Sequence, residues 1–362
     1  MKRLLFVASL AMLAIGCQKT FVENEVQNSI GFDTEVGKQT RAIVSGTTAY
    51  PDNQPFAVYA HAYQNGVYTN TVMNNIEISK NTSWKATGTT AYYWPNDPRT
   101  VIDFYAYSPA HSATLTATDA DKKLNGTIGH AQATNTLSLT GYTHSNMYVD
   151  FMVATPVKGA TFSDQNGEAT DKDPKDESVP VSFHHQMTQI IFNVKTKEYT
   201  GVTFTVNSIT FNRILNAASF EQDYADNYGT WTPAATVASY DIFPADGEAA
   251  AVVDHTDAKT LKTTPVTMIP QTLTATDKVA SGDIISDGGQ SFTVEYTIAG
   301  NGVASETVVK TFEFADAATA PAWNPNAKIT YTLTIGLNEI TFAPSVVDWE
   351  PGSGSYDIDD NI

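Results

Sequence analysis

Short runs in which apolar and polar residues alternate recur along most of the chain after residue 17. This two-residue period is typical of β-strands that bury one face, and no long stretch shows the 3.6-residue period of an amphipathic helix. Turn sequences such as Gln64-Asn65-Gly66 separate the runs. The clearest alternation lies at residues 56–60, 148–153, 292–298 and 329–337. The pattern therefore predicts an all-β protein.

One polar segment divides the chain into two halves. Residues 164–178 contain six acidic residues, two lysines and a proline but no large apolar side chain. Such a segment buries too little surface to offset the entropy lost on ordering, so we expect an exposed linker over residues 161–178. Because strands recur at short spacing on both sides, two β-sandwiches fit better than one barrel. We place them at residues 42–160 and 179–338, with a C-terminal strand or tail at 339–362.

Alternating segments also occur near both ends of the chain. Ile30, Phe32 and Val36 share one face of the segment 28–36, as expected of a strand that lies on a core. Two further registers occur near the C-terminus, formed by Ile340 with Phe342 and by Tyr356 with Ile358. A C-terminal strand could complete its own domain or pair with another chain, and the last residues could also be a frayed acidic tail.

Alternation in the second half changes register. Apolar residues occupy odd positions up to Met187 and even positions from Ile190 onward. One extra residue in a strand produces such a shift, so the sequence predicts a β-bulge or a strand break near Thr188 or Gln189.

The first residues have the features of an export signal. Lys2 and Arg3 precede an apolar run over residues 4–15, which is too short to span a bilayer. The sequence Ala14-Ile15-Gly16-Cys17 resembles a bacterial lipobox, in which the cysteine is acylated and becomes the N-terminus after signal cleavage. We therefore predict a signal peptide at residues 1–16 and lipidation of Cys17. The alternative is an ordinary signal followed by a core cysteine.

Composition excludes several classes of partner. The 362 residues carry 21 Lys and Arg against 39 Asp and Glu, a formal net charge of -18. Nucleic acids and anionic lipid surfaces attract basic proteins, so we expect no nucleic-acid partner and membrane attachment through the lipid anchor only. The single cysteine cannot form an internal disulfide.

The sequence offers little for catalysis or metal binding. The usual motifs of zinc proteases, serine hydrolases and phosphate-binding loops do not occur. His184 and His185 are adjacent on a predicted strand and so point to opposite faces, which favours one hydrogen-bonded core histidine beside an exposed one. The acidic runs are best interpreted as solvated charge, with calcium binding as the alternative. Residues 92–94 are best interpreted as part of an aromatic core, with stacking on a sugar as the alternative. We expect no catalytic residue, no cofactor and no metal.

Motifs along nearly the whole chain resemble the fimbrillin family, the type V pilins of Bacteroidales and their accessory subunits. Each motif alone is short, and their order and spacing make the resemblance specific. The motifs are the lipobox, Ile30-Gly31-Phe32, Thr40-Arg41-Ala42, Tyr93-Trp94-Pro95, residues 103–107, 150–154 and 181–187, Met268-Ile269-Pro270-Gln271, Trp323-Asn324-Pro325, residues 329–333 and Val347-Asp348-Trp349.

This resemblance implies a fold and a maturation pathway. It implies two tandem transthyretin-like β-sandwich domains, export as a lipoprotein, and an arginine-specific protease that removes an N-terminal strand. Arg41 and Ala42 stand where that cleavage would fall, so residues 17–41 form a leader with a removable strand. The segment around Arg41 is polar and short of large apolar residues, which suits an exposed cleavage site.

Three functions are considered, of which a β-sandwich hydrolase is the least favoured. The first is a structural subunit of a cell-surface fimbria, which assembles head to tail when a neighbour's strand fills the groove that the removed strand leaves. Its partners would be other fimbrial subunits and the arginine-specific protease. The second is a tip or accessory adhesin that stays anchored in the outer membrane through Cys17 and binds a host receptor or glycan.

Overall fold

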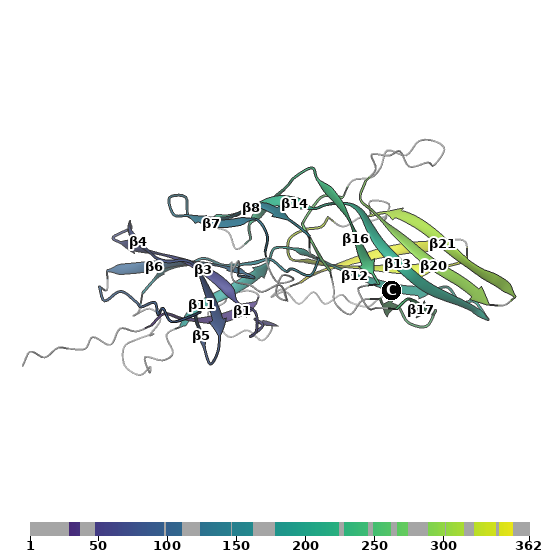
Figure 1. Ribbon diagram of the computed structural model, residues 1–362, viewed down its shortest axis with the longest axis horizontal. Coiled ribbons are helices and arrows are strands. Elements are labelled where there is room, and N and C mark those ends of the chain that lie inside the picture. Colours follow the sequence, from purple (N-terminus) through teal and green to yellow (C-terminus); the bar gives the residue numbers. More distant parts are fainter. Residues whose placement is uncertain are drawn as a thin grey trace, which may run out of the picture.

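The computed structural model describes residues 29–36, 48–97, 99–110, 124–145, 147–161, 178–223, 228–244, 249–261, 266–273, 289–300, 302–314, 322–337 and 340–349. Regular structure in these residues consists of β-strands, arranged in two lobes that lie end to end (Figure 1). The predicted all-β fold is confirmed. Among the described residues, no helix is long and apolar enough to cross a membrane.

A nine-stranded sheet forms the main part of the first lobe. Its strands are β1 (Gly31–Val36), β2 (Thr48–Ala49), β3 (Phe56–Gln64), β4 (Val67–Lys80), β5 (Trp84–Ala86), β6 (Thr100–Ser108), β9 (Met152–Ala154), β10 (Val157–Ala160) and β11 (Ser178–His185). They pair in the order β10-β6-β3-β4-β5-β1-β11-β9, with β2 beside β1, and β9 also pairs with β6. The last pairing closes seven of these strands into a ring. Apolar side chains from all of them fill its interior.

A second, four-stranded sheet covers part of the outside of this ring. It contains β7 (Thr127–Ala131), β8 (Thr136–Thr143), β14 (Ala217–Gln222) and β15 (Thr230–Pro233), in the order β15-β14-β8-β7. Tyr59 and Tyr105 project from β3 and β6 toward Leu139 and Phe220 of the small sheet. Strands β3 and β6 are therefore buried on both faces, which explains why their sequences are apolar almost throughout.

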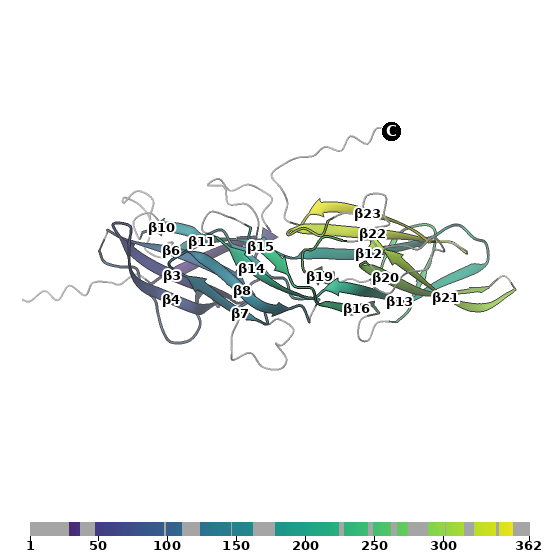
Figure 2. The ribbon, with the colours of Figure 1, turned by 90° about the horizontal axis from the view of Figure 1, so that it is seen from above.

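The second lobe is a β-sandwich of two five-stranded sheets (Figure 2). One sheet contains β12 (Thr188–Thr196), β18 (Lys259–Thr260), β19 (Val266–Met268), β22 (Ala327–Ile335) and β23 (Ile340–Asp348). The other contains β13 (Val202–Leu215), β16 (Val237–Phe243), β17 (Ala251–Val253), β20 (Ser291–Gly300) and β21 (Val303–Glu313). Their inner faces share one core, in which Phe192, Phe211, Phe292 and Tyr331 are buried.

Strand pairing differs from the domain boundary that the sequence predicted at 161–178. Strand β11 follows that segment yet pairs with β1 and β9, and β14 and β15 extend the small sheet of the first lobe. The first lobe is thus built from residues on both sides of the acidic segment, of which residues 162–177 lie outside the described part of the chain. Two pairings are also parallel rather than antiparallel, β1 with β11 and β12 with β22.

The predicted irregularity near Thr188 is confirmed as a strand break. Strand β11 ends at His185 and β12 begins at Thr188. Between them, Gln186 and Met187 carry the chain from the first lobe into the second. The change of alternation therefore records a change of sheet, since each strand faces a different core.

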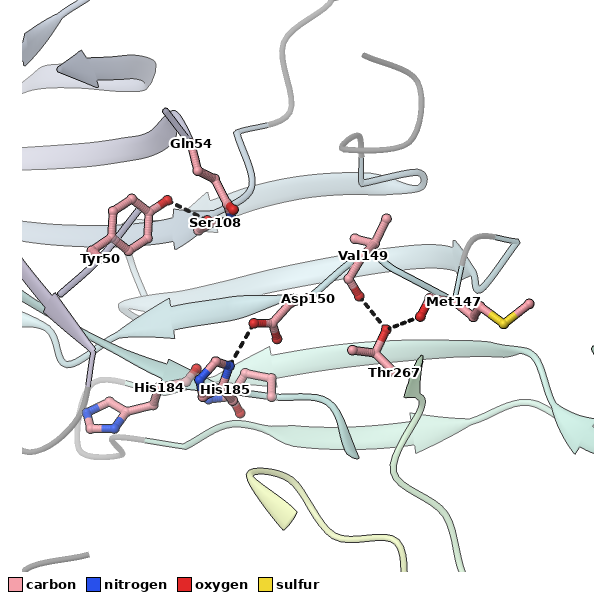
Figure 3. A network of polar contacts seen from close by, with 10 residues as sticks. Tyr50, Gln54, Ser108, Met147, Val149, Asp150, His184, His185 and Thr267 are labelled. Carbon is pink, nitrogen blue, oxygen red and sulfur yellow. Dashed lines mark hydrogen bonds and ion pairs between the residues drawn. The ribbon is translucent and has the colours of Figure 1, made fainter. Parts of the chain in front are cut away.

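Polar contacts join the lobes between β19 and the residues that follow β8. The Thr267 hydroxyl donates to the carbonyl oxygens of Val149 at 2.8 Å and Met147 at 3.1 Å (Figure 3). The His144 Nε2 lies 2.6 Å from the Thr267 carbonyl oxygen, and its Nδ1 lies 2.8 Å from the Tyr142 hydroxyl. Because the Thr267 carbonyl can only accept, Nε2 carries a proton, and in the neutral ring Nδ1 accepts from the Tyr142 hydroxyl. Burial lowers the pKa of His144 to about 4.

Candidate assembly site around strand β1

Strand β1 lies inside the large sheet, with neighbours on both sides. Along one side it runs parallel to β11, with pairs from Gly31 and Ser178 to Val36 and Phe183. Three short pieces cover the other side: a bridge from Ser29 to Tyr93, one pair with β5, and two pairs with β2. We call the groove that β1 occupies between β11 and these three pieces the β1 seat.

The apolar side chains of β1 point into the ring. Ile30 and Phe32 are each 3% exposed and Val36 is 5% exposed. The Phe32 ring meets Phe56 and Phe104 edge-on, with centroids 5.8 Å and 5.9 Å away. By area alone, three such side chains contribute roughly 5–9 kcal/mol, before ladder hydrogen bonds and ordering costs. The face of β1 that carries Asp33 points outward.

Aromatic residues surround the end of β1 near Val36. Tyr50 stacks on Phe183, with ring centroids 4.7 Å apart, and meets Trp84 at 5.4 Å. The Tyr50 and Ser108 hydroxyl oxygens lie 2.7 Å apart (Figure 3). Burial raises the pKa of Tyr50 well above its usual value, so its hydroxyl stays protonated. The seat is therefore lined by rigid, uncharged side chains that favour an apolar strand.

The segment 92–94 lies beside the start of β1. The Ile30 backbone N–H donates to the Tyr92 carbonyl oxygen at 2.8 Å. Trp94 is buried in the ring, where its indole meets Phe104 edge-on at 5.8 Å, whereas the Tyr93 ring is exposed. The favoured interpretation of this trio as an aromatic core holds for Trp94.

A match to a known protein family covers most of the chain. The model of a family described as fimbrillin-like matches residues 40–349. The chain belongs to the fimbrillin-like family. This membership supports a structural role as a subunit of a cell-surface fimbria. A search of curated protein sequences gives no significant match.

Solved structures similar to this fimbrillin-like chain include proteins from Bacteroides. A fimbrial protein from Bacteroides vulgatus superposes with a TM-score of 0.54 at 19% identity, over 89% of this chain and 99% of that chain. Candidate cell adhesion proteins from Bacteroides ovatus and Bacteroides uniformis give TM-scores of 0.48 and 0.44, at 15% and 14% identity. Each covers 89% of this chain and 98% of that chain. At 19% identity, the match to the Bacteroides vulgatus protein supports the fold alone.

Several predicted site residues lie outside the described part of the chain. They are the lipidation residue Cys17, the cleavage residues Arg41 and Ala42, and the C-terminal candidates Tyr356 and Ile358. Arg41 and Ala42 fall in the 37–47 stretch that connects β1 to β2. Because β2 pairs antiparallel with β1, a cut at Arg41 would convert the connection between paired strands into an association of two separate chains.

The other C-terminal candidates belong to β23, which lies in the second lobe. It pairs with β22 at nine positions, from Ala327 and Asp348 to Ile335 and Ile340. Ile340 is buried, whereas Val346 and Val347 are 49% and 59% exposed. Strand β23 therefore completes its own domain as a sheet edge, and Phe342 lies opposite Leu333 in this ladder.

The two adjacent histidines at the end of β11 are both buried, which corrects the expectation that one is exposed. His184 Nε2 lies 2.9 Å from the Thr155 hydroxyl. His185 Nδ1 lies 2.7 Å from an Asp150 carboxylate oxygen (Figure 3). Trp349 stacks on the outer side of His185 with centroids 3.8 Å apart. These contacts give both rings structural roles, and Trp349, which follows β23, touches the strand that forms one wall of the β1 seat.

Sequence reasoning found β1 but missed most of the walls of its seat. The apolar alternation of Val181 and Phe183 was visible, but nothing local linked it to a strand about 150 residues earlier in the chain. Trp84, in a strand of three residues, also gave no periodic signal. The one sequence feature that could have indicated these walls is the concentration of aromatic residues near these positions. Among the described residues, no group of three or more metal-ligating side chains comes together.

Proposed function

We propose that this protein is an exported fimbrial subunit whose β1 strand is removed by cleavage after Arg41 and replaced by a strand from a neighbouring subunit. The burial of Ile30, Phe32 and Val36 inside the ring carries this proposal. Loss of β1 would uncover apolar core on one face and main-chain groups of β11 and β2 on both sides. Such a groove favours an extended chain, because ladder hydrogen bonds give affinity and alternate side chains give register.

The donor strand comes from the C-terminal end. Strand β23 could donate only by leaving β22, with which it pairs at nine positions. Residues 350–362 follow that strand and carry Tyr356 and Ile358, whose two-residue spacing matches the spacing of Ile30 and Phe32. We therefore place the donor in residues 350–362. Insertion of one subunit's end into the next is head to tail and yields an open filament.

Export as a lipoprotein completes the proposal. Acylation of Cys17 would hold the uncut precursor at the outer membrane, since each buried methylene contributes about 0.8 kcal/mol. Cleavage after Arg41 would then separate residues 42–362 from both the lipid anchor and β1. The same cut thus frees the subunit and opens its seat.

The test combines proteolysis with assembly. Exported protein treated with an arginine-specific protease should be cut after Arg41 and form ladders on SDS gels run without boiling. The Arg41→Ala variant should resist this cut, whereas Lys38→Ala, which also changes a cation in the same stretch, should be cut normally. Deletion of residues 350–362 should leave cleavage intact and abolish the ladder. Cut protein that stays monomeric would contradict the proposed assembly.

A second function, the anchored adhesin that binds a host glycan or protein, makes a different prediction. Surface protein would then begin at the acylated Cys17 and retain residues 17–41. Mass spectrometry of the N-terminus of surface protein separates the two, because a processed subunit begins at Ala42.

A further inference from the structure

Strand β21 is the longest of the strands that end a sheet in the described part of the chain. It spans eleven residues, Val303–Glu313, and pairs with β20 along one side only. The other edge strands are shorter, and β23, with nine residues, is interrupted by Pro344. Residues 303–313 contain neither proline nor glycine. An exposed edge of this kind presents unpaired main-chain groups to another strand.

Two exposed charges on β21 lack a partner within the sheet. Glu306 and Lys310 lie opposite Ile298 and Val294 of β20, so both project from the same face, on either side of Val308. Neither forms an ion pair with another described residue. Four residues of extended strand separate them by about 13 Å, which is too far for contact within one chain.

The order of these charges makes the edge complementary to itself. We propose that β21 pairs antiparallel with β21 of a second copy, about a two-fold axis at Val308. In this register Glu306 lies opposite Lys310 of the second copy, and the reverse pair forms symmetrically. Opposite charges directly across an antiparallel pair stabilise it, and like charges destabilise it. On the other face, Thr307 lies opposite Val309, which is 57% exposed in the single chain.

Other registers lose this match. If the axis shifts by one residue or by half a residue, Glu306 of one copy no longer lies opposite Lys310 of the other. If it shifts by two residues, Glu306 faces Glu306 of the second copy, or Lys310 faces Lys310. Parallel pairing in register brings both of these like-charged pairs together. Because each copy carries a net charge of -18, which repels another copy, the two local ion pairs select the register rather than supply a general attraction.

This contact differs in kind from the strand insertion proposed above. It uses the same surface on both copies and closes on itself, so it joins two molecules side by side and cannot by itself extend a filament. It involves the second lobe, needs no cleavage at Arg41 and leaves the β1 seat untouched. Its failure and the failure of strand insertion are therefore distinguishable.

Cysteine cross-linking of the full chain on cells tests the axis. Residues opposite each other in an antiparallel pair have Cα atoms about 4.5–5.5 Å apart, within the range of a disulfide. Val308→Cys should therefore form a disulfide-linked homodimer under mild oxidation. Ser305→Cys, an exposed position on the same strand, should not, because two copies of residue 305 lie about 20 Å apart. Unchanged protein, which retains Cys17, gives the background.

Charge reversal tests the register. Glu306→Lys in the Val308→Cys background should lower the homodimer yield several-fold, and adding Lys310→Glu should restore it. Glu221→Lys, an equal change on the exposed side of β14, should have no effect. Co-expression of Thr307→Cys and Val309→Cys chains gives a second cross-link that leaves Val308 intact. Cross-linking of Ser305→Cys to the same extent, absence of both expected cross-links, capture of a different protein in their place, or no rescue by the double reversal would overturn the proposal.

Discussion

Strands β1 and β23 lie near opposite ends of the described chain and are held in opposite ways. Strand β1 has neighbours on both sides and buries Ile30, Phe32 and Val36 in a ring of strands. Strand β23 has one neighbour, and most of its described side chains are exposed. Loss of an interior strand leaves a groove with two walls, whereas loss of an edge strand leaves only another edge. We therefore expect a subunit without β1, and not one without β23, to accept a strand from another chain.

The largest expected effect comes from Phe32. Replacement of Phe32 by Ala removes a buried ring that meets two other aromatic rings, so the free energy of unfolding should fall by about 3–5 kcal/mol. Denaturant unfolding of the uncut protein measures it. A loss below about 1 kcal/mol would mean that β1 contributes little to the core and would contradict the contrast between a buried β1 and an exposed β23.

Acid should destabilise the fold through the buried histidine at the junction of the two lobes. His144 has a pKa of about 4 in the folded protein, against about 6.5 when unfolded, so the unfolded state binds more protons between these values. Stability therefore falls as the pH drops from 6.5 toward 4, by up to roughly 3 kcal/mol, and this contribution levels off below 4. Unfolding at several pH values checks this.

A matched variant isolates that histidine from the many carboxylates. His144→Gln keeps a donor and an acceptor but does not titrate, so its stability should depend less on pH over this window. Amide hydrogen exchange should still be slower in β1 than in β23 at pH 5, because His144 forms its hydrogen bonds with neither strand. An unchanged pH dependence in the variant would contradict the assignment.

Loss of Trp349 should loosen β23 more than β1. Trp349→Ala removes the ring that stacks on His185, and we expect a loss of about 1–2 kcal/mol, since aromatic contacts add to the area buried. Amide hydrogen exchange should show faster exchange across β23 and little change in β1. Equal loss of protection in both strands would show that Trp349 supports the whole first lobe.

The smallest effect is expected on the exposed part of β23. Val347 is 59% exposed, so Val347→Ala should change the free energy of unfolding by no more than about 0.5 kcal/mol. Denaturant unfolding of Val347→Ala and Phe32→Ala under the same conditions compares the stability that each strand contributes. A cost similar to that of Phe32→Ala would place β23 in a core that the exposed fraction does not reveal.

The sequence predicted individual strands better than their partners. Alternation identified β1, β22 and the break before Thr188, because burial of one face constrains residues two apart. It could not assign β11 to β1, or β14 to β8, since these pairs join segments far apart in the chain and depend on global packing. The same limit hid the walls of the seat, and it made the acidic segment look like a boundary between two independent halves.

The pairing of β9 with β6 has a consequence for a subunit that has lost β1. Strand β11 stays tied to β9 at three positions, and β9 stays tied to β6 at two, so the ring opens at one gap without losing its far wall. The β11 side of such a vacancy would therefore keep its place, and an incoming segment would not need to rebuild that wall. Preorganisation of this wall would lower the entropic cost of binding a strand there.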